Sequence, residues 1–532
     1  MRPFCRINEL STMVRTHSTL ISALALLPGV AISQANSEDI DKLVEMGKNK
    51  NQVMLHLKKL AQIGPRLTGS PNLRRAQDWA MDNFKKWGLQ NVHLDQWGDV
   101  PVGFERGKRQ VGRMVSPTKR DFQFTTMNWM PGTDGLKSGP AVNAPKTIEE
   151  FNSMKDKLRG AWILMPTPAG MRGPTIQDND LKRAIDRAGI LGRVFGTADE
   201  RVHSSGSWRD KTYENRPTDI NINIRKSDYT AVAESIAAGK TPVLEFDAEV
   251  HWFKGPIAQY NVVADIVGSE KPDEIVIVCG HLDSWNSPGS QGASDNGTGT
   301  VTAMEAARIL ALSKVKPKRT IRFILWSGEE QGLLGSRAYV EKHKDQMDKI
   351  SAVLNDDGGS NYHGGYQGVA GMKEMMEAAF APTVKAFPDL PMEFQTRPTM
   401  PSGGSSDHAP FNFVGVPGFF TMEKGKQDYG FVWHTQHDRI EHTVPEYLIQ
   451  SSTNHAVVAF SLAQAPSLLP RAPKPTARTV DLNGPAVGHD QMFEDPALHA
   501  GQDHDHEDDW VLELRDRLQR QFRFITTVIR AR

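Results

Sequence analysis

The residues that decide the fold of this chain lie between positions 274 and 360. This stretch begins as EIVIVCGHLDSWNSPGSQGASDNGTGTVTAMEAARIL (274–310), continues as KRTIRFILWSGEEQGLLGSRAYV (318–340) and ends as AVLNDDGGS (352–360). Three apolar runs (EIVIVCG, TIRFILW and SAVLN) read as buried strands, and helical patterns at 297–312 and 331–343 separate them. Strands that alternate with helices in this way are typical of parallel βαβ units. We therefore predict an α/β fold with a mixed, mostly parallel sheet flanked by helices.

Carboxylates and a histidine follow each apolar run directly. They are His281 and Asp283 after the first run, Glu329 and Glu330 after the second, and Asp356 and Asp357 after the third. Ligands of open α/β sheets bind outside the carboxyl ends of the strands. Clustered carboxylates repel one another, and burying them is costly unless cations compensate the charge. Histidine with carboxylates suits zinc, so these strand ends, together with Asp295 in the glycine-rich turn SDNGTGT, predict a metal centre rather than solvated loops.

Five motifs together indicate a family. GHLDSW (280–285), ASDNGTG (293–299), WSGEEQGLLGS (326–336), NDDGG (355–359) and WHTQHD (433–438) resemble those of the co-catalytic di-zinc aminopeptidases. This family includes the bacterial leucyl aminopeptidases and the carboxypeptidase Q (plasma glutamate carboxypeptidase) branch, and the resemblance covers roughly residues 36–465. It implies the zinc exopeptidase fold and two Zn²⁺ ions per chain, because paired zinc ions are a known device for peptide hydrolysis.

The resemblance also implies a role for each matching residue. The metal ligands would be His281, Asp295, Glu330, Asp357 and His434, with Asp295 bridging both ions. Glu329 would be the general base, and Asp283 would hold the second ring nitrogen of His281. Asp356 is disfavoured as a ligand by its spacing from Glu330, and His408, His437 and His442 are expected not to bind metal. The peptide bond between Asp295 and Asn296 is expected to be cis. Trp433 stands where some relatives have a tyrosine that stabilises the oxyanion, which leaves the oxyanion donor open.

A second pattern of strands and helices interrupts the catalytic order. Residues 147–253 contain LRGAWILMP, DLKRAIDRAGILGRVFG and SDYTAVAESIAAGKTPVLEF, which read as alternating strands and helices. This segment resembles a protease-associated domain, which favours the carboxypeptidase Q branch. We expect it to act as a lid or as a contact in a homodimer. The catalytic domain would then be formed by residues 36–146 and 254–465.

The two ends of the chain differ in composition from the centre. Residues 1–35 read as a secretory signal, with arginines before the apolar run LISALALLPGV, a cleavage site near Ala35, and a start at Met1 or Met13. We therefore expect export to the periplasm or beyond, and the apolar run is too short for a transmembrane span. Residues 466–532 are first Pro- and Ala-rich, then acidic with His504 and His506, and end in a basic amphipathic helix of open role.

Composition excludes several other classes of protein. The 532 residues carry 63 Lys and Arg against 63 Asp and Glu, so nothing indicates nucleic acid as a partner. Only Cys5 and Cys279 are present, too few for a disulfide framework or a cysteine-based zinc site. We therefore expect an exported zinc exopeptidase, an aminopeptidase or a dipeptidase of the carboxypeptidase Q type, that acts on small peptides. The alternatives are a glutaminyl-cyclase-like acyltransferase with one zinc ion on the same fold and a receptor-like binding module without metals.

Overall fold

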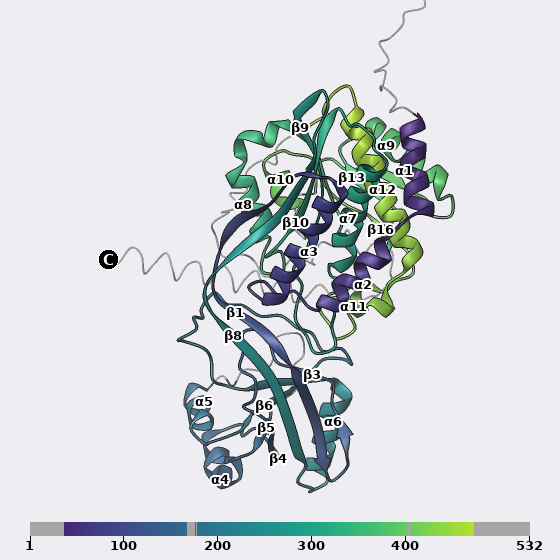
Figure 1. Ribbon diagram of the computed structural model, residues 1–532. Coiled ribbons are helices and arrows are strands. Elements are labelled where there is room, and N and C mark those ends of the chain that lie inside the picture. Colours follow the sequence, from purple (N-terminus) through teal and green to yellow (C-terminus); the bar gives the residue numbers. More distant parts are fainter. Residues whose placement is uncertain (1–36, 167–175, 177, 402–405, 473–532) are drawn as a thin grey trace, which may run out of the picture.

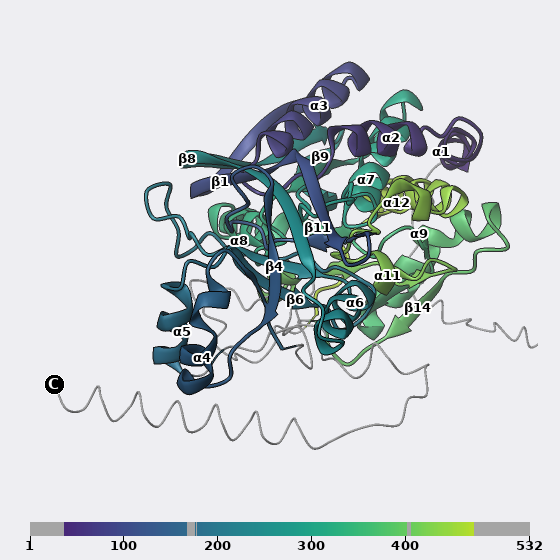
Figure 2. The same cartoon turned by 90° about the horizontal axis from the view of Figure 1, so that it is seen from below.

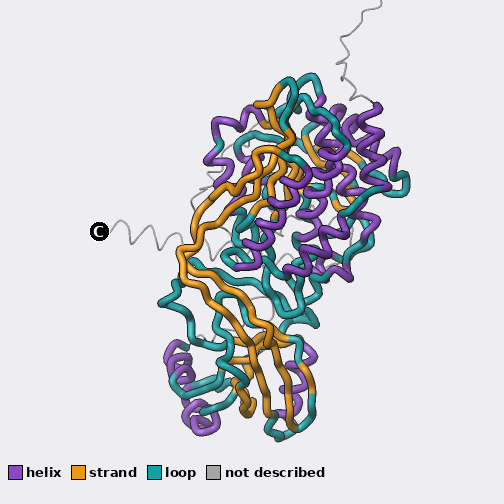
Figure 3. Tube along the Cα trace, in the orientation of Figure 1, coloured by secondary structure: helices purple, strands orange, loops and turns teal. Residues whose placement is uncertain are grey.

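Two long antiparallel strands run through the whole molecule. In the computed structural model, which describes residues 37–166, 176, 178–401 and 406–472, strand β1 (Gln90–Ser116) pairs with β8 (Val243–Ile266) along almost its full length. The two strands pass from an upper body, which holds most of the helices, to a smaller lower lobe (Figures 1 and 3). The sequence predicts only shorter strands here. In the structure the shorter strands form two continuous ones, because the backbone N–H and C=O groups of β1 and β8 pair with each other. Several β-bulges accommodate the shifts in register between the two strands.

The sheet of the upper body contains the three strands predicted from the apolar runs. Its order is β15-β11-β9-β10-β8, and its parallel core consists of β9 (Lys271–His281), β10 (Arg319–Trp326), β11 (Ile350–Asn355) and β15 (Gly418–Phe420). Strand β8 joins this core antiparallel to β10. The predicted α/β fold with a mixed, mostly parallel sheet is confirmed. The carboxyl ends of β9, β10 and β11 consequently meet at one edge of the sheet.

Successive residues of these strands are buried on opposite faces of the sheet. In β9, Val276 and Val278 pack into a core formed with the helices of one face, whereas Ile277 and Cys279 pack into the core of the other face. The helices of the first face are α1 (Ser37–Asn49), α2 (Val53–Ile63), α3 (Pro71–Trp87), α7 (Gly297–Leu312), α9 (Lys373–Ala386) and α12 (Pro445–Gln464). Those of the second are α8 (Leu334–Lys342) and α10 (Ala409–Phe413). Burial on both faces explains why the strands are almost uninterrupted apolar runs.

The lower lobe is a smaller α/β unit with its own apolar cores. Its sheet continues from β8 through β4 (Lys137–Asn143), β5 (Trp162–Leu164), β6 (Gly192–Gly196), β7 (Asn221–Ile224) and β3 (Phe124–Thr125), and β2 (Arg120–Asp121) pairs with β1. Helices α4 (Ile148–Leu158) and α5 (Asn179–Asp186) lie on one side of this sheet, and α6 (Lys226–Ala237) lies on the other (Figure 2). Strands β3 and β4 precede residue 147, so the lobe also includes chain before the segment predicted as an insertion.

The remaining elements are short and surround the strand ends of the upper body. They are the pairs β12 (Tyr362–His363) with β16 (Glu423–Lys424) and β13 (Gly365–Gly368) with β14 (Glu393–Thr396), helix α11 (Tyr429–Val432), and 3₁₀ turns at Lys344–Lys349, Ala370–Met372 and Ile440–His442. Among the described residues, no helix is both long and apolar enough to cross a membrane. The predicted signal segment and the predicted C-terminal helix lie outside the described residues.

Candidate metal centre

The three parallel strands and two loops bring the predicted residues into one buried cluster. His281 is the last residue of β9, Glu329 and Glu330 follow β10, and Asp357 follows β11. Asp295 lies just before α7, and His434 lies in the loop after α11. All six side chains are at most 8% exposed. The structure therefore assembles the whole predicted ligand set from positions spread over 154 residues (434 minus 281, counting both ends).

Asp295 lies between the two histidines and presents one carboxylate oxygen to each. Its Oδ1 is 3.4 Å from His281 Nε2, and its Oδ2 is 3.2 Å from His434 Nε2. Each histidine also faces a second carboxylate: His281 Nε2 lies 3.0 Å from Asp357 Oδ1, and His434 Nε2 lies 3.1 Å from Glu330 Oε2. Two three-residue groups thus share one aspartate, which is the arrangement required of a carboxylate that bridges two ions.

The backbone around Asp295 is held by the residue that follows it. The peptide bond between Asp295 and Asn296 is cis, as expected. The Asn296 side chain accepts a hydrogen bond from Gly299 N–H at 2.9 Å and caps the start of α7. Its amide also donates to the carbonyl of Asp356 at 2.7 Å. Asn296 therefore ties the Asp295 loop both to α7 and to the end of β11.

Glu329 and Glu330 are neighbours in sequence that face different partners. Glu330 Oε1 accepts a hydrogen bond from Trp285 N–H at 3.1 Å, while its Oε2 faces His434. Glu329 Oε2 instead lies 3.8 Å from His281 Nε2. Glycines before and after the pair have φ of +74° and +112°, which permits this sharp turn.

Asp283 lies behind His281 but contacts it mainly through its backbone. His281 Nδ1 is 3.0 Å from the carbonyl oxygen of Asp283 and 3.7 Å from its carboxylate. The carboxylate instead accepts hydrogen bonds from the Thr68 hydroxyl at 2.9 Å and from Glu329 N–H at 3.3 Å. Asp283 thus contacts His281 through its backbone carbonyl group, and Thr68 and Glu329 through its carboxylate.

Burial and crowding shift the pKa values of the clustered acids. The pKa of Glu330 rises to about 8, first because the group is buried and then because Asp295 is near. The pKa of Asp357 rises to about 6, chiefly through burial. Burial alone would lower the pKa of His434, but Glu330 and Asp295 outweigh it and raise this pKa to about 10. The pKa of Asp295 moves the other way, below its ordinary value, because hydrogen bonds from His281 and His434 outweigh its burial. Without a cation, the cluster therefore holds protons at neutral pH.

The residues fit a pair of zinc ions. Asp295 is 4% exposed, and its Oδ2 faces His434 Nε2 at 3.2 Å. The close contacts join two imidazoles and three carboxylates. The carboxylate of Glu329 also lies within reach of a cation placed beside His281 and Asp357. Imidazoles and carboxylates are ligand types that zinc accepts, and the negative charge of the carboxylates is the kind that divalent cations offset.

His408 lies close to the centre but outside both groups of ligands. Its Nδ1 is buried without a hydrogen-bond partner among the described residues, and burial lowers its pKa to about 4. Its ring packs against Phe420 at 5.5 Å. His437 stacks on Phe431 at 4.2 Å, and His442 packs on the same ring at 5.4 Å. These packing contacts contrast with those of His434, whose Nε2 faces the carboxylates of Asp295 and Glu330 at 3.2 and 3.1 Å.

Several supporting residues were not singled out from the sequence. Arg66 is fully buried and donates to the carbonyl groups of Leu282 and Gly292, at 2.6 and 2.8 Å, so that it clamps the loop between His281 and Asp295. Burial lowers its pKa to about 10. Trp285 packs edge-on against His434 at 5.8 Å. The turn GPRLTGS (64–70) and the tryptophan of GHLDSW were the available signals, but neither shows which loop it contacts.

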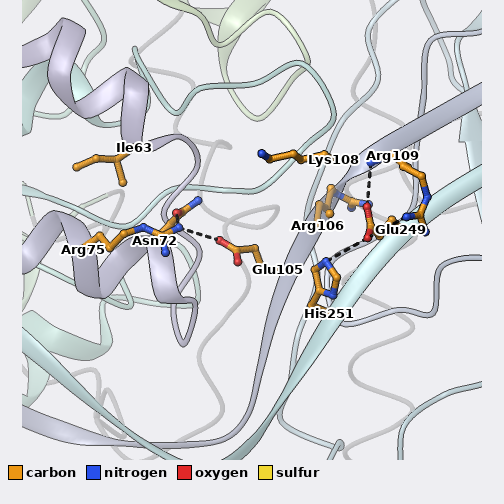
Figure 4. A pocket seen from close by; sticks show the side chains of 10 residues that line it. Ile63, Asn72, Arg75, Glu105, Arg106, Lys108, Arg109, Glu249 and His251 are labelled. Atoms are coloured by element: carbon orange, nitrogen blue, oxygen red, sulfur yellow. Dashed lines mark hydrogen bonds and ion pairs between the residues drawn. The ribbon is translucent and has the colours of Figure 1, made fainter.

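A cleft elsewhere in the molecule does not include the centre. It has a volume of about 620 Å³ and lies beside the β1–β8 ribbon, where Ile63, Asn72 and Arg75 of α2 and α3 face Glu105 of β1 (Figure 4). None of the predicted site residues lines it. The buried cluster therefore lies outside this cleft.

Comparisons with known proteins agree with the motifs. Residues 261–459 match the profile of peptidase family M28. Carboxypeptidase Q of Mus musculus is 28% identical over 452 residues, which cover 82% of this chain and 92% of the relative. Leucine aminopeptidase 1 of Penicillium rubens is 31% identical over 241 residues, which cover 41% of this chain and 60% of the relative.

A solved structure shares the fold. It is a peptidase M28 precursor from Shewanella amazonensis, which superposes with a TM-score of 0.58 at 24% identity and covers 82% of this chain and 99% of that one. The resemblance expected from the motifs is confirmed by the match of residues 261–459 to peptidase family M28 and by the carboxypeptidase Q relatives. These matches support a metallo-exopeptidase.

Proposed function

We propose that this protein is an exported exopeptidase that uses two zinc ions to hydrolyse small peptides. One observation carries the proposal: Asp295 presents its two oxygens to His281 and His434, at 3.4 and 3.2 Å. One ion would be held by His281, Asp295 and Asp357, and the other by His434, Asp295 and Glu330. When bound, such ions lower the pKa of a water molecule towards about 7 and polarise the scissile carbonyl group.

Glu329 is the general base in this proposal. Its carboxylate lies beside His281, but Glu329 is not one of the five residues proposed to bind the ions. The Glu329 residue is 1% exposed. It takes the proton of the attacking water and delivers it to the nitrogen of the leaving amine. Asp283 orients it, because the Asp283 carboxylate accepts the hydrogen bond of the Glu329 backbone N–H.

The substrate class is best described as small peptides of the kind hydrolysed by a carboxypeptidase Q-type dipeptidase. Carboxypeptidase Q relatives align with 82% of the chain, including the lower lobe, whereas the leucine aminopeptidase aligns with 41%. The lower lobe, proposed as an inserted protease-associated-like domain, contacts the catalytic loop: Ser204 N–H donates to the carbonyl of His434 at 2.8 Å. We interpret the lobe as a lid that restricts substrate size.

Zinc content and substrate profiling test this proposal together. The purified protein should contain two zinc ions at its catalytic centre and hydrolyse free dipeptides, while C-amidated dipeptides should be poor substrates. Equal activity on C-amidated and free dipeptides, with loss on N-blocked ones, would indicate an aminopeptidase instead. Cyclisation of an N-terminal glutamine with one catalytic zinc would indicate the acyltransferase.

Export rests on the predicted signal segment, which lies outside the described residues. Mass spectrometry of the protein secreted from a bacterial host should show an N-terminus near Asn36. Retention of residues 1–35 in the mature protein would contradict this part of the proposal.

A further inference from the structure

A second buried cluster of metal-binding side chains lies behind the catalytic centre. It contains Asp356, His363 and His455, whose ligand atoms all lie within 4.8 Å of one another. These residues come from the end of β11, from β12 and from the middle of α12. All three are at most 2% exposed. The cluster shares no residue with the predicted catalytic ligands, although Asp356 is adjacent to Asp357 in the chain.

The ligand atoms of the cluster are separated by distances close to those between the ligand atoms of a zinc ion. His363 Nε2 lies 2.9 Å from Asp356 Oδ2, and His455 Nδ1 lies 3.9 Å from the same oxygen. Ligand atoms about 2.0–2.2 Å from a tetrahedral zinc ion lie about 3.4 Å from one another. A fourth donor is present in Glu423, the cross-strand partner of His363, whose Oε1 lies 3.8 Å from His363 Nε2.

Unpartnered polar atoms point to a missing ligand rather than to a closed hydrogen-bond network. Neither ring nitrogen of His455 has a hydrogen-bond partner among the described residues, although the side chain is fully buried. Glu423 Oε2 is also buried without such a partner. Leaving a buried polar atom without a hydrogen bond is unfavourable. A cation between these groups would satisfy His455 Nδ1 and offset the charge of two acids at once.

The surroundings of His363 suit a metal ligand. Its Nδ1 lies 3.1 Å from the side-chain amide of Asn454, which also reaches the hydroxyl of Tyr366 at 2.8 Å. With the amide turned over, Asn454 Oδ1 would accept from His363 Nδ1–H and leave Nε2 free to bind a metal. Such hydrogen bonds to the second nitrogen are the usual support of a metal-bound histidine.

We propose that Asp356, His363, His455 and Glu423 bind a further divalent metal ion of the zinc type, separate from the catalytic pair. Metal binding at His363 Nε2 would replace its hydrogen bond to Asp356, with the proton of that bond released to solvent. The carboxylates of Asp356 and Glu423 would offset the two positive charges of the ion. The ion would join β11, β12, β16 and α12 directly behind Asp357. Its role would be structural, because Asp356, His363 and His455 are at most 2% exposed.

Counting metal ions in matched variants tests this site. The background carries His504→Gln and His506→Gln, which removes the histidines of the acidic tail as adventitious ligands. In the zinc-loaded, gel-filtered full-length protein, His455→Gln should lower the zinc content by one ion per chain relative to this background, and His363→Gln should do the same. His56→Gln is the matched control, because His56 is buried and paired with Glu305 at 3.1 Å in another region of the fold; its zinc content should not change.

The difference between variants and background decides the test, whatever the number of catalytic ions. The proposal is overturned if His455→Gln and His363→Gln keep the full zinc content of the background. If neither variant folds, anomalous scattering at the zinc edge from crystals of the unmodified protein decides. A peak between Asp356, His363 and His455 supports the site, and no peak there refutes it.

Discussion

At the scale of single residues, Glu329 and Glu330 are neighbours in sequence that face different partners. Glu330 faces His434 at 3.1 Å, whereas Glu329 lies beside His281 at 3.8 Å. Glu329→Gln should keep its zinc but lower turnover at least about a hundredfold, because the amide cannot accept the proton of water. Glu330→Gln should lose zinc, and added zinc should partly restore its activity. Zinc analysis and steady-state kinetics of both variants check this, and an active Glu329→Gln enzyme that holds both ions would contradict the mechanism.

The two buried histidines near the centre allow a paired comparison. His434 contacts Asp295 and Glu330, whereas His408 is buried next to the centre and packs on Phe420. His434→Ala should therefore lose about one zinc ion per chain, while His408→Ala should keep the content of the unmodified protein. Atomic emission analysis of dialysed protein measures both. The opposite pattern would show that the other loop supplies the ligand.

The pKa values of the clustered residues predict proton release on zinc binding. Glu330 has its pKa raised to about 8, and His434 has its pKa raised to about 10, so this pair holds at least one proton at pH 7 that a bound ion displaces. Zinc affinity should therefore rise as the pH increases from 6 to 8. Calorimetry of the metal-free protein in buffers of different ionisation enthalpy measures the protons released. His434→Ala should release fewer, and affinity independent of pH would refute the expectation.

At the scale of elements, Glu305 joins two helices that pack on the sheet. Glu305 lies in α7 and accepts hydrogen bonds from the Gln52 N–H at 2.8 Å and from the Arg308 side chain at 2.7 Å. Its carboxylate also lies 3.1 Å from His56 Nε2. Gln52 directly precedes α2, and His56 lies within α2. Its burial would raise its pKa, but Arg308 and His56 outweigh this effect and lower it. A carboxylate with a lowered pKa stabilises the fold above its unfolded pKa of about 4.3, and the stabilisation is lost as the pH falls through the folded value.

Glu305→Gln should therefore destabilise the protein by about 2 kcal/mol at pH 7, since it removes the charge from hydrogen bonds to charged partners. The difference from the unmodified protein should shrink as the pH falls below about 4. Urea unfolding of the metal-free forms at several pH values measures it. Glu341→Gln is the control, because Glu341 forms an exposed pair with Lys344 and should change the free energy of unfolding little. A difference that persists unchanged at low pH would refute the argument.

At the scale of the whole molecule, the lower lobe is fastened to the loop that carries His434. The Gln436 side chain accepts from Val202 N–H at 2.8 Å and donates to Gln123 and to the carbonyl of Glu200, at 2.8 and 3.1 Å. Gln436→Ala removes all three bonds, each worth about 1 kcal/mol. Amide exchange should then become at least about tenfold faster at 200–206 and 430–438, with α7 and α12 unchanged.

Hydrogen–deuterium exchange with mass spectrometry measures this local opening. Gln464→Ala serves as the control, because Gln464 makes one exposed hydrogen bond, to the carbonyl of Lys316, at the end of α12. If Gln436→Ala exchanges like the unmodified protein in both segments, the lobe is held by other contacts and the proposed lid does not depend on this side chain.

The sequence by itself determined the sheet and most of the centre. The apolar runs become β9, β10 and β11, which end at His281, Trp326 and Asn355. The rule that ligands gather at strand ends therefore placed four of the site residues: His281, Glu329, Glu330 and Asp357. His434 lies far along the chain from the other predicted ligands. It was predicted because the motif WHTQHD resembles a motif of the family. Hydrophobic periodicity and sequence motifs were sufficient to predict these features, because both depend only on residues that are close together in the sequence.

Only the tertiary structure decided the contacts between distant segments. The length of the β1–β8 ribbon depends on pairing between strands more than 120 residues apart, and neither strand has a pattern that reveals its partner. The clamp of Arg66 on the loop at 282–292 and the meeting of Asp356, His363 and His455 likewise require chain segments that no local signal connects. Hydrogen bonds and packing between such segments depend on where the folded backbone places them, and this is the physical reason why the sequence alone did not show them.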